Sequence, residues 1–195
     1  MKNARVKKLA VIAMLAALSV VLVWAVRIPL IPMVSFLEYD PADIPILIGA
    51  LAYGPVAGVV LTVVVSLIQG LTVSASSGVY GILMHIVGTG SMVLAASLVY
   101  KFVHTKRGGV LGLILGVLVR PAVMLPANHF ITPAFTGWPV EQVDALLLPG
   151  ILPFNLITAG INCAVTFLVY KTVSRYLIHG DPFAVGKGRK ARTAH

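Results

Sequence analysis

Six apolar segments, separated by short breaks that contain polar residues, glycine or proline, follow one another along the chain. They cover residues 8–27, 42–53, 55–71, 79–103, 109–131 and 147–174. The second and third segments are divided at Pro55, because a proline disfavours helix at the residue before it. The strict alternation of apolar and polar positions that is typical of a barrel strand does not occur in these segments. The pattern therefore predicts six helices.

The composition places these helices in a membrane. Of the 195 residues, 58% are hydrophobic and 11% are charged, whereas a soluble domain carries about 25% charged residues. Lipid offers no partner to an unpaired backbone group, so helices are the expected spanning elements. We predict an all-α integral membrane protein with six transmembrane helices in a single domain, residues 1–178, followed by a basic cytoplasmic tail, residues 179–195. The first apolar run is longer than the core of a signal peptide, about 7–15 residues, and is expected to remain as the first helix.

The distribution of charge predicts the orientation. All 15 Lys and Arg residues except Arg27 and Arg120 fall on one side of the membrane if the N-terminus is cytoplasmic. Cytoplasmic loops carry an excess of Lys and Arg, so both the N- and the C-terminus are predicted to be cytoplasmic. The cations flank apolar runs and form no basic surface interleaved with aromatic residues, which argues against a nucleic-acid partner and leaves the lipid bilayer. The acids then expected on the outside are Glu38, Asp40, Asp43, Glu141 and Asp144.

Motifs that carry chemistry are few. Residues 180–188, GDPFAVGKG, depart from a phosphate-binding loop in spacing, and a glycine stands where Ser or Thr would hold magnesium. Any uptake would therefore draw its energy from another protein or from an ion gradient. His85 and His129 lack the paired ligands of a metal or haem site and are expected to make polar contacts, and Cys163 is a lone thiol. No Gly-x-Ser-x-Gly nucleophile motif occurs. We expect neither an enzyme nor a metal site.

Three carboxylates, half of all the acids in the chain, lie within six residues: Glu38, Asp40 and Asp43. Asp40 precedes a proline and suits a turn. Asp43 is placed to cap the second helix or to lie in its first turn, where a negative charge meets the positive end of the helix dipole. Arg120 lies halfway along the fifth segment, where a charge needs a polar partner or water. A structural role and a contact with a ligand are both open for Arg120.

A set of polar side chains gathers near the outer ends of segments three to six. Amide, phenol and imidazole groups among apolar walls suit a polar heterocycle with several hydrogen-bonding edges. We therefore expect a cavity that opens to the outside. The residues expected to line it are Gln69, Tyr80, His85, Asn128, Asn155 and Thr158.

Small residues recur at helical spacing in two segments. Ala13 and Ala17 form such a pair in the first segment, and Gly112 and Gly116 form another in the fifth. Close backbone approach drives the association of helices in lipid, where the hydrophobic effect between them is absent. Each pair is open to two interpretations, packing inside the protein or docking on a partner membrane protein.

Residues 36–58, FLEYDPADIPILIGALAYGPVAG, resemble the substrate-binding S component of energy-coupling factor (ECF) vitamin transporters, most closely the riboflavin type. Three further stretches resemble the fourth, fifth and sixth helices of that family. They are SSGVYGILMH at 76–85, VMLPANHFITPAF at 123–135 and LPFNLITAGIN at 152–162. The resemblance covers about residues 8–175.

The resemblance implies a multi-pass protein of the prokaryotic plasma membrane that binds riboflavin from outside with high affinity and has no ATPase activity of its own. It implies as partners a transmembrane coupling protein and two ATPase subunits, with Ala13 and Ala17 as the docking motif of the first helix. Riboflavin would be the transported ligand, and no cofactor is expected. The loop expected to close over the ligand contains Phe36, Leu37, Glu38 and Tyr39.

Two positions depart from the riboflavin type, in which an Asn is common where this chain has His85 and a Lys where it has Thr158. A Thr cannot supply the ammonium group of a Lys, so another vitamin or small heterocycle is the alternative ligand. Flavin mononucleotide would need a cation near the pocket, for which Arg27 and Arg120 are the candidates.

The alternative from another class is a stand-alone ion-coupled secondary transporter, although no acid falls within a spanning segment away from its end. An intramembrane hydrolase or haem protein comes third.

Overall fold

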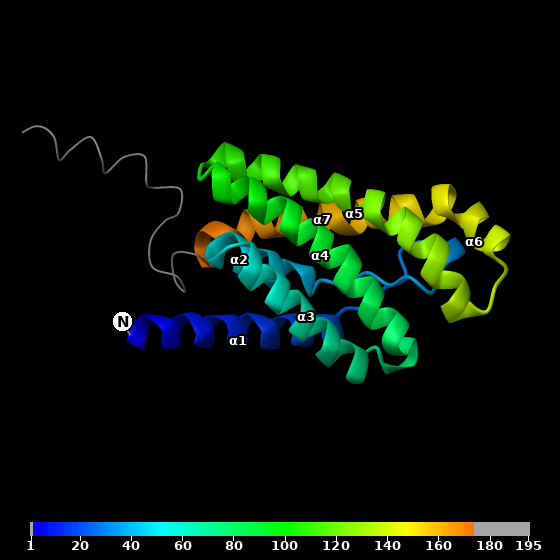
Figure 1. The fold of residues 1–195 in the computed structure, drawn as a ribbon, viewed down its shortest axis with the longest axis horizontal. Coiled ribbons are helices and arrows are strands. Elements are labelled where there is room, and N and C mark those ends of the chain that lie inside the picture. Colours follow the sequence, from blue (N-terminus) through cyan, green and yellow to red (C-terminus); the bar gives the residue numbers. More distant parts are fainter. Residues whose placement is uncertain (1, 174–195) are drawn as a thin grey trace, which may run out of the picture.

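The computed structural model describes residues 2–173, and the predicted basic tail lies outside the described residues. The described residues form helices and one isolated antiparallel bridge between Ile28 and Tyr39. Figure 1 shows the arrangement of the elements along the long axis of the molecule. In chain order the elements are α1 (Lys2–Ala25), η1 (Pro32–Val34), α2 (Asp43–Tyr53), α3 (Pro55–Leu71), η2 (Ala75–Ser77), α4 (Gly78–Phe102), α5 (Lys106–Thr136), α6 (Val140–Leu146), η3 (Leu147–Ile151) and α7 (Leu152–Val173).

The six predicted segments appear as α1 to α5 and α7, which confirms the all-α, six-helix membrane architecture. The prediction missed the short helix α6 and the π-helical turn η3 that follows it. It also ended the fifth helix too early, because α5 continues to Thr136 through Pro126 and Pro133. Prolines are tolerated inside spanning helices, since neighbouring groups re-satisfy the backbone groups that they free.

Two of the six helices are short. Among residues 2–173, four helical spans are long and apolar enough to cross a membrane, whereas α2 has 11 residues and α3 has 17. At about 1.5 Å per residue, α2 rises about 16 Å, roughly half of a hydrocarbon core of about 30 Å. The two helices meet at Gly54, whose φ of 91° favours glycine. Because α2 spans only about half of the hydrocarbon core, its N-terminal end lies inside the bundle when its C-terminal end, at Gly54, reaches the membrane surface.

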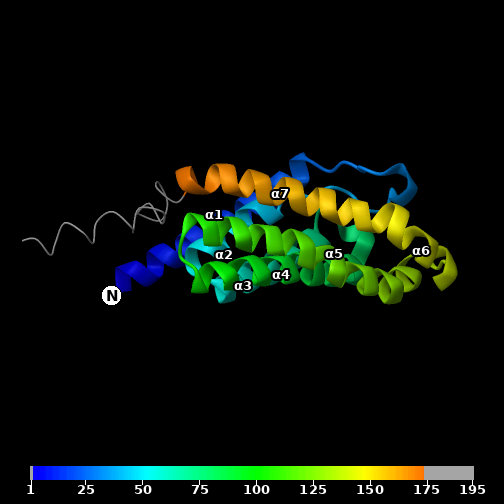
Figure 2. The same cartoon turned by 90° about the horizontal axis from the view of Figure 1, so that it is seen from above.

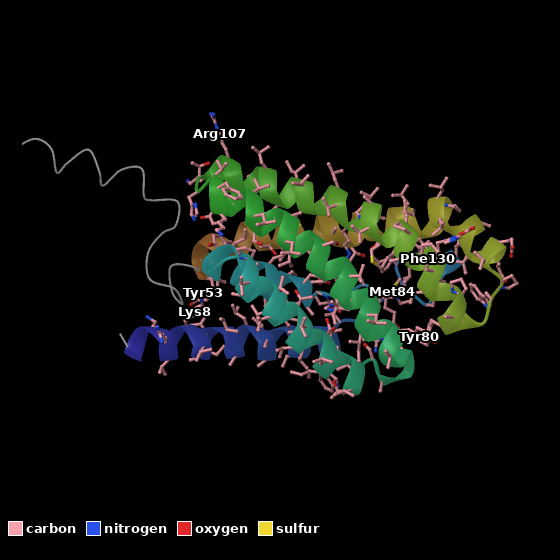
Figure 3. All side chains as sticks on the ribbon, in the orientation of Figure 1. Lys8, Tyr53, Tyr80, Met84, Arg107 and Phe130 are labelled. Carbon is pink, nitrogen blue, oxygen red and sulfur yellow. The ribbon has the colours of Figure 1, made fainter. Side chains whose placement is uncertain are left out.

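The start of α1 and the end of α7 lie at the same end of the bundle, together with the α2–α3 turn and the α4–α5 connection (Figure 1). Figure 2 shows α6 and the segment between α1 and α2 at the opposite end. Lys8 and Arg107 mark the first end in Figure 3. We name it the cytoplasmic end, because it carries the described Lys residues, and we name the opposite end the outer end.

The helix α2 lies at the centre of the bundle. Eight of its 11 residues are buried, and it contacts α1, α3, α4 and α7. Ile46 and Leu47 of α2 are fully buried in the main apolar core with Leu61 and Met92. The position of α2 therefore determines what its first residue, Asp43, can contact.

The two pairs of small residues have different surroundings. A Cβ atom added at Gly112 would lie 2.5 Å from the carbonyl oxygen of Ala96, so this glycine lets α5 pack closely on α4. Gly116 faces the same helix, which makes the pair in α5 an internal packing site. Ala13 and Ala17 are exposed on α1, so internal packing is the wrong interpretation of that pair.

Candidate ligand-binding site

The segment between α1 and α2, residues 26–42, folds back over the outer end, and we name it the outer strap. Its two arms are joined where the backbone N–H of Tyr39 donates to the carbonyl oxygen of Ile28 at 2.8 Å. Arg27 forms an ion pair with Glu38 across the same two arms. Arg27 Nη1 also donates to the carbonyl oxygen of Val73 at 2.6 Å, just beyond α3. These contacts hold the strap against the bundle.

A pocket of about 130 Å³, which we name the outer pocket, lies beneath the outer strap. The strap supplies aromatic and acidic side chains, and α3 and α4 supply a serine, an amide and an imidazole. The residues that line it are Val23, Arg27, Phe36, Glu38, Tyr39, Asp40, Ser66, Gln69, Gly70, Ser74, Ser77, Gly81 and His85. A smaller hollow of about 70 Å³ lies beside the outer pocket and shares Phe36, Ser77 and Gly81 with it.

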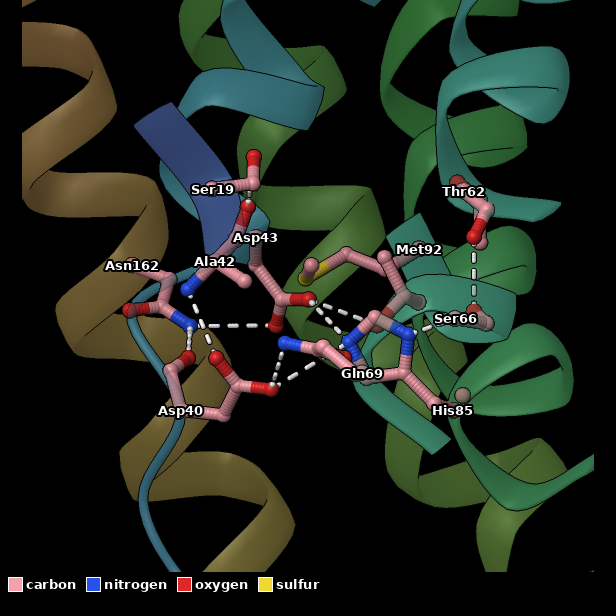
Figure 4. Close-up of polar contacts among 12 residues, drawn as sticks. Ser19, Asp40, Ala42, Asp43, Thr62, Ser66, Gln69, His85, Met92 and Asn162 are labelled. Atoms are coloured by element: carbon pink, nitrogen blue, oxygen red, sulfur yellow. Dashed lines mark hydrogen bonds and ion pairs between the residues drawn. The ribbon is translucent and has the colours of Figure 1, made fainter. Parts of the chain in front are cut away.

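Asp40 is held from two sides at the inner wall of the outer pocket. Its Oδ1 accepts a hydrogen bond from the backbone N–H of Ala42 at 2.7 Å, which confirms the turn predicted there. Its Oδ2 accepts from Gln69 Nε2 at 2.9 Å. One face of this carboxylate is therefore anchored to the strap and the other to α3 (Figure 4).

His85 is oriented by a serine on the neighbouring helix. Ser66 Oγ donates to the carbonyl oxygen of Thr62 at 2.6 Å and lies 2.7 Å from His85 Nδ1. Because Ser66 has a single hydroxyl proton, Nδ1 supplies the hydrogen in this second contact. His85 Nε2 lies 3.4 Å from Asp40 Oδ2 and has no hydrogen-bond partner among residues 2–173. The pocket therefore presents a ring nitrogen and a carboxylate side by side.

A buried ion pair between Asp43 and Arg120 lies next to the outer pocket. Asp43 is fully buried and Arg120 is 7% exposed. Arg120 Nη1 donates to Asp43 Oδ2, while Asp43 Oδ1 accepts from Thr89 Oγ1 at 2.6 Å. Arg120 Nε donates to Asn155 Oδ1 at 3.3 Å. The network thereby links α2, α4, α5 and α7 in one place.

The structure confirms one prediction for Asp43 and corrects another. Asp43 lies in the first turn of α2, one of the two positions predicted for it, and its side chain makes no capping hydrogen bond. It does not face the outside, because α2 is short and its first residue lies between the other helices, where it meets Arg120. For Arg120, the ion pair with Asp43 and its absence from the lining of the outer pocket favour a structural role over a contact with a ligand.

The buried ion pair is joined to the outer strap through Asn162 of α7. Asn162 Nδ2 donates to Asp43 Oδ2 at 3.0 Å and to the carbonyl oxygen of Asp40 at 2.9 Å. The hydroxyl of Tyr39 donates to Asn162 Oδ1 at 2.8 Å. Figure 4 shows the dashed lines that run from the Asn162 side chain to both Asp40 and Asp43. Burial, reinforced by the negative charges of Asp43 and Asp40, raises the pKa of the Tyr39 phenol above its ordinary value of 10.0, which keeps it a hydrogen-bond donor.

Asn162 belongs to a buried polar stripe along α7 that the sequence prediction found only in part. Asn155, Thr158, Asn162 and Thr166 recur at spacings of three and four, so they share one face of the helix. All four are buried, and the hydroxyls of Thr158 and Thr166 have no hydrogen-bond partner among the described residues. The same spacing, extended by one turn from Thr158, would have identified Asn162.

The structure separates the predicted ligand-contacting residues into two groups. Of these residues, Phe36, Glu38, Tyr39, Gln69 and His85 line the outer pocket, and Tyr80 lines the hollow beside it. The predicted residues that line neither space are Leu37, Asn128, Asn155 and Thr158.

Two of the residues that line neither space, Leu37 and Asn128, make their contacts elsewhere in the outer half of the protein. Leu37 packs against an apolar cluster at the outer end. Asn128 donates to the carbonyl oxygen of Met124 and accepts from Thr132, both within α5. His129 makes a polar contact as expected, with its Nδ1 2.6 Å from Asp144 Oδ1.

Eight residues that line the outer pocket were not predicted as ligand contacts, among them Arg27, Asp40 and Ser66. Ser66 lies three residues before Gln69 and therefore on the same face of α3, a signal that the sequence did contain. Of the two cations considered for a phosphate group, Arg27 lines the pocket and Arg120 does not. The contact of Arg27 with the pocket depends on how the strap folds back, which no local pattern indicates.

Known proteins resemble this chain in sequence and in fold. The family model described as "ECF transporter, substrate-specific component" matches residues 7–170. Riboflavin transporter RibU of Staphylococcus aureus is 27% identical over 88% of this chain and 92% of its own length. Riboflavin transporter FmnP of Bacillus subtilis is 28% identical over 85% of this chain and 91% of its own. Riboflavin transporter RibU of Streptococcus thermophilus is 28% identical over 88% of this chain and 85% of its own length.

A solved structure described as the S component of a bacterial ECF transporter superposes with a TM-score of 0.78 at 28% sequence identity. The superposition covers 91% of this chain and 99% of the other. Together with the apolar helices, these relatives identify a multi-pass protein of the prokaryotic plasma membrane. The chain belongs to the family of substrate-specific components of ECF transporters.

Proposed function

We propose that this protein binds riboflavin from outside the cell and delivers it to an ECF-type importer. The observation that carries the proposal is the outer pocket, in which aromatic rings of the strap lie opposite hydrogen-bonding groups of α3 and α4. Phe36 and Tyr39 offer faces for stacking on a planar ring system. Gln69, His85 and Asp40 offer donors and acceptors for the polar edge of that ring. The names of the curated relatives support riboflavin as the ligand.

Ligand entry requires the outer strap to move. A flavin ring with its ribityl chain is larger than the outer pocket of about 130 Å³. Phe36 lies on the wall that the pocket shares with the hollow beside it, together with Ser77 and Gly81. A displacement of Phe36 would join the two spaces. A larger displacement of the whole strap would break its contacts with the bundle, which are those of Arg27 with Val73, of Asp40 with Gln69, and of Tyr39 and Asp40 with Asn162.

Riboflavin is the transported cargo in this proposal and no resident cofactor takes part. Transport is energised by separate ATPase subunits that act through a transmembrane coupling protein. The exposure of Ala13 and Ala17 on α1 supports a docking role for this small surface, because small exposed residues let a partner helix approach closely in lipid.

The ligand is tested by a fluorescence titration of riboflavin with the purified protein in detergent. We expect saturable, stoichiometric quenching, because stacking on aromatic side chains quenches the flavin. Phe36→Ala should weaken binding, whereas Phe130→Ala should not, since Phe130 is 74% exposed and lines neither space. Glu38→Ala with unchanged affinity would remove Glu38 as a ligand contact.

The absence of quenching by folded protein would overturn riboflavin as the ligand. The family assignment would remain, and a screen of other vitamins would follow. Another vitamin is therefore the second candidate ligand. It is favoured because Thr158 places a buried hydroxyl, and no cation, where the riboflavin type commonly has a Lys.

The partners are tested by co-purification of the tagged protein from its native membrane. We expect two ATPase subunits and a membrane protein to co-purify. The double variant Ala13→Leu/Ala17→Leu should lose them and still quench riboflavin, whereas Ala122→Leu, at an exposed position of α5, should lose neither property. Riboflavin uptake into vesicles that contain this protein alone would instead support an ion-coupled secondary transporter.

A further inference from the structure

A second cavity lies at the cytoplasmic end, far from the outer pocket along the bundle. It lies between α1, the α2–α3 turn and the end of α4, and its volume is about 480 Å³. We name it the basic cleft. Its polar lining residues are Lys8, Tyr53, Ser97, Tyr100, Lys101 and His104. The proposed binding of riboflavin makes no use of this space.

The basic cleft combines cations from two separate helices. Lys8 comes from α1, and Lys101 comes from the last turn of α4, with His104 just beyond it. Lys8 Nζ lies 5.4 Å from the centre of the Tyr53 ring, a cation–π distance that directs the ammonium group toward the cleft. Figure 3 shows Lys8 and Tyr53 next to each other at this end. The ring of His104 packs against Tyr100 with the ring centres 5.3 Å apart.

The positive charge of the basic cleft is not neutralised within residues 2–173. No carboxylate of these residues lies within ion-pair distance of Lys8 or Lys101. All acids of the described residues lie in the strap, at the start of α2 or in α6. A cavity lined by two ammonium groups and an imidazole is a site for an anion.

The rim of the basic cleft places it at the level of lipid head groups. Val56, which lines the cleft, is 76% exposed, and Phe102, next to Lys101, is 80% exposed. Exposed apolar side chains beside lysines are typical of the boundary between hydrocarbon and head groups. A soluble anion would gain nothing from this apolar rim, whereas the acyl chains of a lipid would cover it.

We propose that the basic cleft binds the phosphate-bearing head group of an anionic phospholipid from the cytoplasmic leaflet. Lys8 and Lys101 hold the phosphate from opposite sides, and Tyr53 and His104 border it. The acyl chains run along Val56 and Phe102. Basic pockets between spanning helices on the cytoplasmic side bind anionic head groups through this combination of charge and apolar contact.

The test is native mass spectrometry of the purified protein titrated with phosphatidylglycerol, phosphatidylcholine or inorganic phosphate. We expect one phosphatidylglycerol to bind in preference to phosphatidylcholine. The double variant Lys8→Gln/Lys101→Gln should weaken that binding about tenfold or more, since it removes both ammonium groups that line the cleft. The matched control Arg5→Gln/Arg107→Gln removes the same charge from the same end outside the cleft, and should change binding less than about twofold.

Circular dichroism checks that each variant is folded, and Lys101→Gln alone replaces the double variant if that protein does not fold. An equal loss of phosphatidylglycerol binding in the two double variants would overturn the proposal, because it would show that the lipid is attracted by the general positive charge of this end and not by the cleft. Inorganic phosphate that competes at the same concentration as the lipid would overturn the lipid assignment in favour of a soluble anion. Unchanged lipid binding with lost co-purification of the ATPase module would overturn it in favour of a protein-docking site.

Discussion

Replacement of Arg120 by methionine tests whether the buried ion pair holds the helices together. The substitution leaves the Asp43 carboxylate fully buried, with Thr89 and Asn162 as its remaining hydrogen-bond donors. Removal of one partner of a buried pair costs about 3–5 kcal/mol. The two remaining donors place the expected loss of unfolding free energy at the lower end, about 3 kcal/mol. For a chain of this size that loss corresponds to a decrease in Tm of about 6–12 °C.

The double variant Asp43→Asn/Arg120→Met removes the uncompensated charge as well. It should be more stable than Arg120→Met alone by about 1–2 kcal/mol, because the neutral amide costs less to bury than an unpaired carboxylate. The measurement is thermal unfolding of the purified proteins in detergent, with Arg107→Met as the control for loss of an exposed cation. The reasoning is refuted if Arg120→Met unfolds within about 2 °C of the wild type. It is also refuted if the double variant is no more stable than the single one.

Four further substitutions have expected outcomes. Thr158→Val removes a buried hydroxyl that has no described partner, so thermal unfolding should show no loss of stability and a gain of up to about 1 kcal/mol; a clear loss would reveal a missed hydrogen bond. Gly70→Ala should lose about 1–3 kcal/mol by overpacking, because its Cβ would lie 2.1 Å from Ile82 Cγ1, whereas Gly90→Ala has open space and should gain up to about 1 kcal/mol. Tyr39 has a raised pKa in the folded protein, so its contribution to stability is complete below pH 10.0 and is lost as the pH rises through the folded pKa; Tm measured from pH 8 to about 12 should therefore fall less steeply in Tyr39→Phe, and identical slopes would contradict the assignment.

Part of the site could be predicted from local patterns. Gln69 and His85 were identified because polar side chains near the ends of apolar segments are few, and both line the outer pocket. Phe36 and Tyr39 were identified through the family resemblance and lie there as well. Asn162 was missed although it continues the spacing of Asn155 and Thr158 by one helical turn.

The sequence by itself predicted the six main helices, their membrane setting and the orientation that the positive-inside rule favours. These properties depend on sums over many residues, such as the length of an apolar run and the side of the membrane on which cations gather. An error at one position changes such a sum little. For this reason the six-helix prediction survived the missed helix α6 and the late end of α5.

Only the tertiary structure decided which polar groups meet. Asp43 and Arg120 are separated by 77 positions in the chain, and their contact requires a specific depth and rotation of both α2 and α5. The same is true of Lys8 and Lys101, which share a cavity although they belong to the first and the fourth helix. Hydrophobicity places a helix in the membrane but leaves its rotation and neighbours open. Close packing around residues such as Gly112 determines these, and with them the position of every buried charge.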